Sequence, residues 1–440
     1  MSIAIITVLM FTSMMLLLLT GRQIFMIIAA VGTISALALY GKGATNMAFF
    51  GGYSFMGWYP LIALPPFVLM GLTLARSGIA DRLFQAIYLW MGGIRGGLAM
   101  GDVGFSCLVS MMSGTNVAST VTSGTISLPA MLKRKYDKIL AVGVVLAGGG
   151  LGFLIPPSVN FILYGVIAKV SIGHLWIAGI VPGFLLAFMY IVYIIIRCRF
   201  QPHLGPPVPP EERVGWGDKF RALGAGISPL ILIFIVLGLL FMGVTTLLEC
   251  SAIGAVGALA IAAIYRRLSW PLFKEICDET LKTTTLVLWI FMAALTFSSV
   301  FDGLGATHAV EQILYSVGGG PLMIIVVMQL TFILMGMVLD DTAMLFIVAP
   351  LYIPIVAKLG FSLVWYGVLY IVNCQMAILT PPFGFTLFIL KGVAPKEVTM
   401  ADIYRSVWPF VVIQAVALAL LIRFPQIALW LPSIFFRGAS

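Results

Sequence analysis

The amino-acid sequence predicts an all-α, polytopic membrane protein with two inverted repeats, each containing a re-entrant helical hairpin and a broken helix. Hydrophobic residues make up 61% of the 440 residues and charged residues 9%, whereas a soluble domain carries about 25% charged residues. Long apolar runs recur along the whole chain, and residues 225 positions apart match in its two halves. Composition therefore places the chain in a lipid bilayer, and the spacing indicates a duplication.

Apolar runs of 17 or more residues predict the membrane-spanning helices. Each run is long enough to cross a hydrocarbon core of about 30 Å as an α-helix. The first run is predicted to be a retained span, because no basic residue precedes it and Gly21, Arg22 and Gln23 lead directly into the next apolar run. Examples of these runs are residues 3–20, 175–196, 227–244 and 403–421.

Charge, cysteine and histidine content exclude several classes of function. The net charge of +9 comes from lysines and arginines in short loops, where the positive-inside bias places them, so no nucleic-acid partner is needed to explain it. The five cysteines lie far apart without a CxxC motif, which indicates neither a disulfide framework nor a zinc site. The three histidines are isolated and form no pair for a haem. The chain is predicted to be a carrier and not an enzyme, with no cofactor and no transition metal.

The internal repeat keeps one spacing over more than 120 residues. Chance matches of alanine or valine are expected in apolar sequence, but prolines and glycines held in one register indicate two copies of one unit. The first repeat is predicted to cover residues 1–200 and the second residues 227–440. Residues 201–226 begin with a proline-rich, polar stretch and are predicted to form an extended cytoplasmic linker. The matches include Gly78 with Gly303, Gly93 with Gly318, Pro129 with Pro354, and Pro156-Pro157 with Pro381-Pro382.

The orientation of the spans follows from the basic residues. Residues 133–138 contain four lysines and arginines, the densest cluster in the chain, so this loop is predicted to lie in the cytoplasm. The corresponding loop of the second half holds only Lys358, which indicates that the repeats are inverted. Both termini are then expected outside the cytoplasm, although residues 424–440 are alternatively expected to lie along the membrane surface.

Each repeat is predicted to contain a hairpin that enters the membrane and leaves on the same side. The first covers about residues 96–132 and turns at the polar tip 113–120. The second covers about residues 320–358 and turns at the tip 340–342. The spacing of 225 positions places Asn116 on Asp341.

Each repeat is also predicted to contain a broken helix, over about residues 136–170 and about residues 362–391. The proline pairs remove two backbone donors and free the carbonyls that they would have bonded. Such groups persist at membrane depth only where they are buried in protein or line a wet cavity. Four breaks, paired by the repeat, therefore predict one central site.

The expected chemistry of this site is electrostatic. A helix that begins in mid-membrane attracts an anion, and a helix that ends there offers carbonyls to a cation. No lysine or arginine lies near a break, so a substrate carboxylate or sulfonate is expected to bind to amides and hydroxyls. One Na⁺ is predicted at Ser113 and Asn116 with the carbonyls of Gly152, Ile155 and Pro157, a second at Asp341 with those of Ala377, Thr380 and Phe383, and the substrate at Thr115, Ser119, Thr120, Ser158 and Thr342.

Simpler interpretations exist for some of these side chains. A serine or threonine in a membrane helix usually bonds its own backbone or a neighbouring helix. An acid at membrane depth is costly and usually functional, although Asp340 is an equal candidate to its neighbour Asp341. Asp102 and Glu249 are predicted to lie at the ends of spans, where water reaches them.

Four motifs resemble the large membrane subunit of tripartite ATP-independent periplasmic (TRAP) transporters, the DctM-like family. The resemblance implies an elevator-type, sodium-driven importer in a bacterial inner membrane. It further implies a small four-helix membrane subunit (Q type) and a soluble periplasmic binding protein (P type) that delivers a small organic anion. The motifs are Ser113-Gly-Thr-Asn-Val-Ala-Ser-Thr120, Gly150-Leu-Gly-Phe-Leu-Ile-Pro-Pro-Ser158, Leu339-Asp-Asp341 and Thr380-Pro-Pro-Phe-Gly384.

The chain departs from that family pattern at two places. Asn116 and Val117 stand where the family tends to have glycine, serine or alanine, and Ala377 replaces an expected glycine before Thr-Pro-Pro. The nearest alternative is a stand-alone sodium/anion carrier of similar architecture that needs no binding protein. A proton-conducting subunit would need a chain of lysine, glutamate and histidine through the bilayer, which this sequence lacks.

Overall fold

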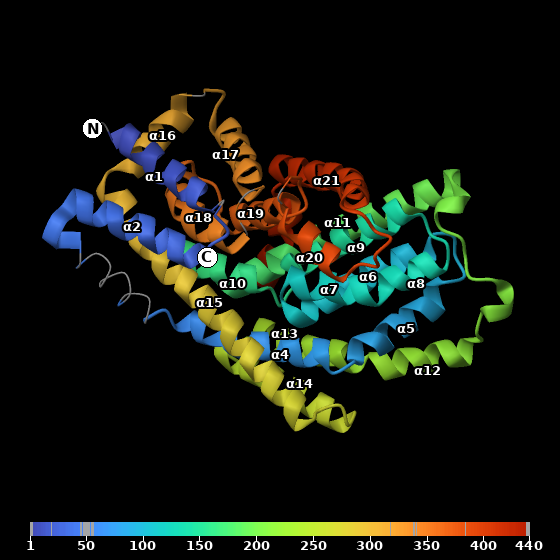
Figure 1. Cartoon of the computed structure of the whole chain (residues 1–440). Coiled ribbons are helices and arrows are strands. Elements are labelled where there is room, and N and C mark those ends of the chain that lie inside the picture. Colours follow the sequence, from blue (N-terminus) through green and yellow to red (C-terminus); the bar gives the residue numbers. More distant parts are fainter. Residues whose placement is uncertain are drawn as a thin grey trace.

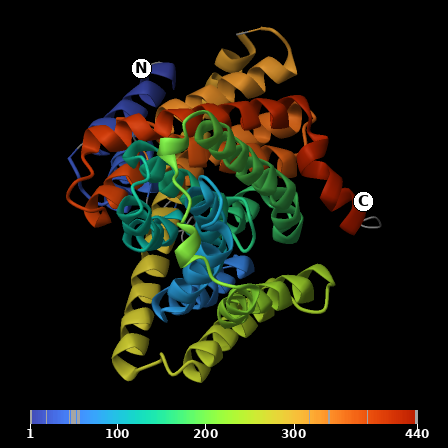
Figure 2. The same ribbon diagram turned by 90° about the vertical axis from the view of Figure 1, so that its right-hand side faces the viewer.

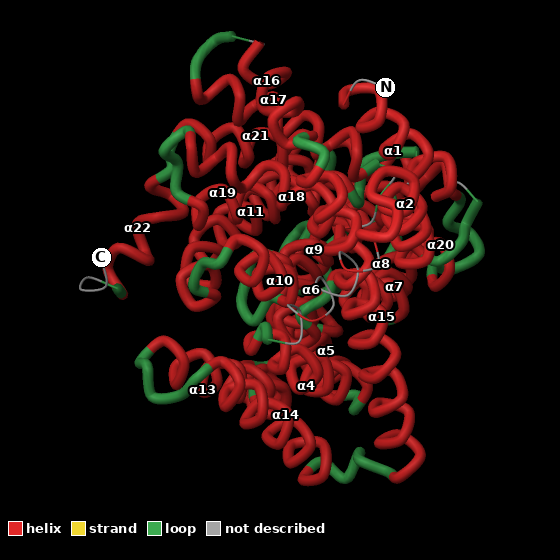
Figure 3. The backbone as a smooth tube through the Cα atoms, turned by 90° about the vertical axis from the view of Figure 1, so that its left-hand side faces the viewer, coloured by secondary structure: helices red, strands yellow, loops and turns green. Residues whose placement is uncertain are grey.

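The computed structural model describes residues 3–18, 20–44, 46, 53, 57–316, 318–337, 339, 341–382 and 384–436. Over these residues the chain folds into α-helices and short 3-10 helices, with no strand (Figures 1 and 3). The chain is thus all-α, as predicted from its composition.

The helices of the first half run from the N-terminus to Phe200. They are α1 (Ile3–Leu18), α2 (Ile24–Tyr40), α4 (Leu64–Arg76), α5 (Ile79–Met91), α6 (Gly97–Ser113), α7 (Asn116–Thr125), α8 (Ser127–Lys133), α9 (Lys138–Gly150), α10 (Val159–Ala168) and α11 (Ile172–Phe200).

The linker is followed by the helices of the second half. They are α12 (Trp216–Gly226), α13 (Ser228–Phe241), α14 (Leu247–Ile264), α15 (Trp270–Gly303), α16 (Ala306–Ser316), α17 (Pro321–Gly336), α18 (Asp341–Lys358), α19 (Leu363–Ala377), α20 (Phe385–Val393), α21 (Met400–Arg423) and α22 (Gln426–Phe435).

Helix boundaries in the two halves recur at the spacing seen in the sequence. Helix α7 begins at Asn116 and α18 begins at Asp341, 225 positions later. Helix α8 ends at Lys133 and α18 ends at Lys358, at the same spacing. These boundaries support a duplication, while the opposite membrane orientation of the two halves stays a prediction.

Six helices among the described residues are long and apolar enough to cross a membrane, or eight if each of two bent helix pairs counts as one span. The bent pairs are α12 with α13, at 52°, and α16 with α17, at 115°. Helices next to the predicted breaks are shorter, with 13 residues in α9 and 10 in α10. The chain is a multi-pass membrane protein in which short helices surround the breaks.

Helices α4, α13, α14 and α15, which we call the arm, project together from one side of the molecule (Figures 1 and 2). Helix α15, with 34 residues the longest described, packs along α2 and α4, and α14 packs along α4 and α13. Helices α6 to α11 and α17 to α21 form a body that contains the segments predicted as hairpins and broken helices. Fully buried aromatic residues such as Trp176, Tyr190 and Tyr366 lie within this body.

The linker is only partly extended, which corrects the prediction for residues 201–226. Residues 216–226 form α12, because Trp216 and Phe220 pack edge-on against Trp90 of α5. The Trp90 indole also donates to the backbone oxygen of Lys219 at 3.1 Å. These contacts stabilise the helix although the hydrophobicity of the segment is low, which is why the sequence predicted a linker there.

The earlier part of the linker is held to the basic loop of residues 133–138. The Arg134 guanidinium donates to Glu212, with 2.9 Å between Nη1 and Oε1. This ion pair lowers the pKa of the exposed Glu212 carboxyl below its ordinary value. The linker therefore follows the surface next to the end of α8.

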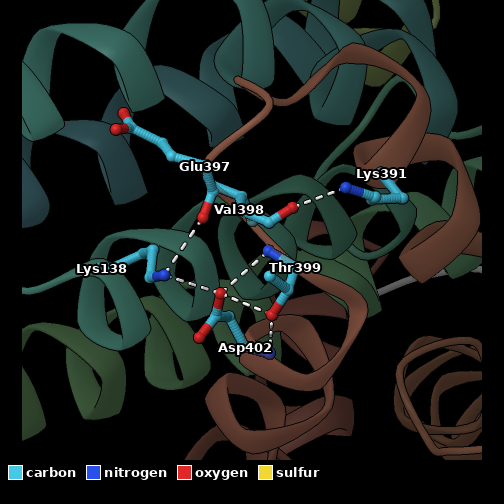
Figure 4. A network of polar contacts seen from close by, with 6 residues as sticks. All are labelled: Lys138, Lys391, Glu397, Val398, Thr399 and Asp402. Atoms are coloured by element: carbon cyan, nitrogen blue, oxygen red, sulfur yellow. Dashed lines mark hydrogen bonds and ion pairs between the residues drawn. The ribbon is translucent and has the colours of Figure 1, made fainter.

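One polar network joins the start of the first broken helix to the start of α21 (Figure 4). The Lys138 ammonium lies 2.8 Å from Asp402 Oδ2 and donates to the Glu397 carbonyl at 3.1 Å. Asp402 and Thr399 form a reciprocal cap at the start of α21. Lys391, in the last turn of α20, donates to the Val398 carbonyl at 2.6 Å. The broken helices of both halves are thus fixed to one short loop.

Candidate ion and substrate site

The tip of the first hairpin is a tight turn that rests on the first broken helix. Helix α6 ends at Ser113, and the next residue, Gly114, has φ of 65°, in the left-handed conformation that glycine tolerates. A side chain at Gly114 would lie 3.0 Å from Val159 Cγ2. Thr115 then caps α7, its hydroxyl accepting from the Ala118 amide. The predicted residues Ser113, Thr115 and Asn116 are therefore brought next to the first proline pair.

The Asn116 side chain links this tip to the second half. Its Nδ2 donates to Thr386 Oγ1 at 2.8 Å, and its Oδ1 accepts from Thr120 Oγ1 at 2.9 Å. Thr386 is the second residue of α20, the helix that follows the second proline pair. All three side chains are buried.

The second tip makes the reciprocal contact. Asp341 opens α18, and its Oδ2 accepts from Asn160 Nδ2 at 2.8 Å. Asn160 is the second residue of α10, the helix that follows the first proline pair. The Tyr370 hydroxyl also donates to the Asp341 carbonyl at 2.9 Å. Each hairpin tip is therefore bonded to the broken helix of the opposite half.

At the first break, α6 packs directly against the backbone. A side chain at Gly152 would lie 1.8 Å from Ser110 Cβ, so only glycine fits there. The Ser110 hydroxyl donates to the Gly149 carbonyl at 2.8 Å. Among the described residues, the Ile155 and Pro157 carbonyl oxygens accept no hydrogen bond. Both carbonyls, which the sequence predicts as cation ligands, keep their lone pairs available.

At the second break the glycine lies on the hairpin helix and not at the break itself. Gly336 of α17 faces Ala377 there, whereas at the first break Gly152 faces Ser110 of α6. The Ala377 methyl group occupies the space that a side chain at Gly336 of α17 would need. A Cβ atom added at Gly336 would lie 2.3 Å from Ala377 Cβ. The missing glycine at 377 is thus compensated by a glycine on the hairpin. The Ala377 carbonyl accepts from the Thr380 amide at 3.0 Å, and the Thr380 hydroxyl donates to Met376 at 2.7 Å. Phe383, the last predicted ligand, lies outside the described residues.

A small cavity lies between the arm and the first tip. Its volume of about 10 Å³ is roughly the space of one ordered water molecule. Phe67 and Met70 of α4 line one side, and Ser113, Pro157 and Ser158 are among the residues that line the rest. Three predicted site residues therefore converge on a space of ionic size.

Most hydroxyls predicted to bind substrate already donate to the protein. Ser119 donates to the Ser106 carbonyl at 2.8 Å, and Ser158 donates to the Phe153 carbonyl at 2.7 Å. Thr120 donates to Asn116. Each oxygen can still accept a hydrogen bond, but donation to a substrate anion would require these bonds to break. Thr342 is half-buried beside Asp341.

Sequence reasoning missed a buried polar layer that also crosses between the halves. The Gln414 and Gln375 amides both donate to the Tyr190 hydroxyl, at 2.8 and 3.5 Å. The Gln375 side chain fills the space next to Gly150. A Cβ atom added at Gly150 would lie 2.5 Å from Gln375 Cγ. Sequence reasoning also missed Asn160 and Thr386. Each is the second residue of the helix that follows a proline pair, and this position was a usable signal.

Asp102 also differs from its prediction. The sequence places it at a water-accessible helix end, yet its side chain is 0% exposed. Helices α7, α8 and α9 pack around α6 and bury it. Glu249, by contrast, is exposed and caps α14 through Thr246.

Comparison with known proteins gives a consistent set of relatives. The family model for the DctM component of the tripartite ATP-independent periplasmic transporter matches residues 11–427. The C4-dicarboxylate TRAP transporter large permease protein DctM of Vibrio cholerae is 29% identical over 402 residues, covering 87% of each chain. The ectoine TRAP transporter large permease protein TeaC of Halomonas elongata is 28% identical, covering 98% of this chain and 100% of its own. The solved YdaH transporter of Alcanivorax borkumensis shares the fold, with a TM-score of 0.67 at 12% identity, covering 93% of this chain and 97% of its own.

Proposed function

The chain belongs to the DctM component family of tripartite ATP-independent periplasmic transporters, and from this premise we propose that it imports a small organic anion together with Na⁺. It is a membrane transport protein of the large permease type and not an enzyme. The substrate is a carboxylate or sulfonate, and the inward Na⁺ gradient supplies the driving force. The observation that carries this proposal is the reciprocal bonding of each hairpin tip to the opposite broken helix.

Two Na⁺ sites follow from the groups at the breaks. The first uses Ser113, Asn116 and the carbonyls of Gly152, Ile155 and Pro157, and the unbonded Ile155 and Pro157 oxygens support it. The second uses Asp341, whose carboxylate supplies a negative charge, with the carbonyls of Ala377, Thr380 and Phe383. Carboxylate, amide and carbonyl oxygens are the ligands that hard cations prefer.

The substrate anion is placed between the two tips. Helices α7 and α18 both begin there, and the unpaired amides of helix N-termini favour negative charge. Thr115 and Thr342 lie in these first turns or directly before them, and Ser119, Thr120 and Ser158 flank them. The names of the relatives specify C4-dicarboxylates and ectoine, and we propose a small organic anion of that size class here.

Transport is proposed to follow an elevator mechanism. The arm stays fixed in the membrane, while the body that holds both tips and both breaks moves across it. The small cavity between Met70 of α4 and the first tip lies at this sliding boundary. Bound Na⁺ and substrate neutralise each other's charge, which lowers the cost of moving the loaded site through the bilayer.

Two partners complete the proposed system. A small four-helix membrane subunit accompanies the chain, and a soluble periplasmic binding protein delivers the substrate. Apolar side chains such as Phe234, Val256 and Ile264 on the outer faces of the arm are more than two-thirds exposed, as expected of surfaces covered by lipid or by another membrane helix.

The decisive experiment is uptake into liposomes. The chain is reconstituted with its small subunit, and labelled C4-dicarboxylates, sugar acids and sulfonates are supplied with or without binding protein and with or without an inward Na⁺ gradient. Uptake that needs both supports the proposal. Uptake by the membrane part alone, unchanged by binding protein, contradicts it and indicates a stand-alone carrier.

A further inference from the structure

Asp102 is the only acid in the buried set of the described residues. It lies on α6, 11 positions before Ser113 at the tip, or about 16 Å along the helix axis. The proposed ion and substrate site at the tips therefore does not include it. The repeat spacing places it on Val327 in the second half, so the first hairpin alone carries an acid at this position.

Two serine hydroxyls lie beside this carboxyl group, and a third is bonded to one of them. Those of Ser123 and Ser127, on α7 and α8, lie against it. Ser106, one turn further along α6, is within 2.7 Å of the Ser123 hydroxyl. All three serines are 0% exposed. Oxygen atoms from three helices thus converge at one buried point.

The group is not satisfied by the protein. Ser123 and Ser127 are close enough to interact with the carboxyl group, but neither carboxyl oxygen of Asp102 nor the Ser127 Oγ forms a well-aligned hydrogen bond with a described residue. Asp102 also makes no ion pair with a described lysine, arginine or histidine. A bare carboxylate buried at membrane depth is strongly unfavourable. A proton or a cation from outside the chain must therefore neutralise it.

We propose that Asp102, Ser123 and Ser127 form a binding site for one Na⁺ that holds the arms of the first hairpin together. One acid balances one monovalent charge, whereas a divalent ion would leave an uncompensated positive charge in the interior. The ligands are hard oxygens, which suit an alkali cation and not a transition metal. Among the described residues, no three histidine, cysteine or acidic side chains are placed to hold a metal ion together.

Ion binding without transport tests this site. Wild type, Asp102→Asn and Asp341→Asn are purified and titrated with ²²Na⁺ at constant ionic strength, with choline as the replacement cation. We expect the Asp102→Asn protein to bind one Na⁺ fewer per chain than wild type. Loss of Na⁺ in Asp341→Asn alone, or in neither variant, would overturn the Asp102 site, and the Asp341→Asn result separately tests the proposed tip site.

Two further variants guard against misfolding and non-specific charge effects. Ser127→Ala keeps the carboxyl group but removes a ligand, and should raise the Na⁺ concentration for half-saturation of this site at least about tenfold. Asp278→Asn removes an exposed acid on α15 and should bind as much Na⁺ as wild type. An unchanged affinity in Ser127→Ala, or equal losses in Asp278→Asn and Asp102→Asn, contradicts the proposal.

Discussion

Asn160 and Thr386 hold the two hairpin tips, although neither is part of a tip. Each is the second residue of the helix that follows a proline pair, and each bonds to the side chain at the opposite tip. Asn160 donates to a charged carboxylate, whereas the Thr386 hydroxyl accepts from a neutral amide, and a hydrogen bond to a charged group is the stronger of the two. Asn160 is therefore expected to be the more sensitive of the two positions.

Replacing Asn160 with alanine should weaken the Na⁺ dependence of uptake. The Asp341 carboxylate loses its 2.8 Å donor, and a hydrogen bond to a charged group is worth about 1.5–3 kcal/mol. We expect the Na⁺ concentration for half-maximal uptake to rise about tenfold or more. Gln426→Ala, which removes an exposed amide on α22, serves as the control. A Na⁺ dependence equal to wild type in Asn160→Ala would show that this bond does not position a ligand.

The two breaks should respond differently to a change of one methyl group. Gly152→Ala places a methyl 1.8 Å from Ser110 Cβ and 2.7 Å from the Ser110 backbone, so α6 must move. Ala377→Gly only opens space beside Gly336, at a cost of about 1 kcal/mol. The thermal unfolding midpoint should fall much further in Gly152→Ala than in Ala377→Gly. Equal midpoints would contradict the packing at the first break.

At the scale of helices, serine and threonine caps mark the starts of several helices in and next to the broken elements. Ser158 caps α10, Ser362 caps α19 and Thr399 caps α21, each accepting from a backbone amide. These caps and the proline pairs can be recognised in the sequence, and the predicted hairpin and broken-helix ranges match the observed short helices to within two residues at their ends. Helix α12 was not predictable in the same way, because its helicity depends on the contact of Trp216 and Phe220 with Trp90.

The two charged residues of the network around Lys138, Lys138 itself and Asp402, should contribute unequally to the free energy of unfolding. Lys138 and Asp402 are a partly exposed pair, with side chains 37% and 16% exposed, and such pairs are worth about 0.2–1 kcal/mol. Asp402 also caps α21 with Thr399, which adds about 1 kcal/mol. Asp402→Asn should therefore destabilise more than Lys138→Met, and the double variant should be close to Asp402→Asn. Chemical unfolding of all three checks this, and simple additivity would refute a direct pair.

At the scale of the whole molecule, the all-α architecture followed from composition, and the duplication predicted from the spacing stays a prediction that the helix boundaries support. The positions of the site residues did not follow from either, because contacts such as Asn116 with Thr386 span 270 positions, and no local pattern encodes them. Asp102 was misplaced for the same reason, since its burial arises from helices α7 to α9 packing around α6. The proposed ligand sets at the tips stay predictions.

A cross-link between arm and body should stop transport if the body moves. Met70 of α4 and Met112 of α6 line the same small cavity, so cysteines at both positions lie close enough to react. In a background without the five native cysteines, oxidation of Met70→Cys/Met112→Cys should abolish uptake, and reductant should restore it. Each single variant is the control. Full uptake by a protein shown to be cross-linked would contradict sliding at this boundary.

The exchange of contacts between tips and broken helices has an evolutionary consequence. After the duplication, neither half could keep its own tip in place, because the partner residue lies in the other copy. We expect a substitution at Asn116 to be tolerated only when Thr386 changes with it, and we expect the same of Asp341 and Asn160, because each pair shares a hydrogen bond. Sequence drift in this lineage is therefore expected in correlated pairs that join the two halves, and the copies can no longer be separated into independent genes without losing the site.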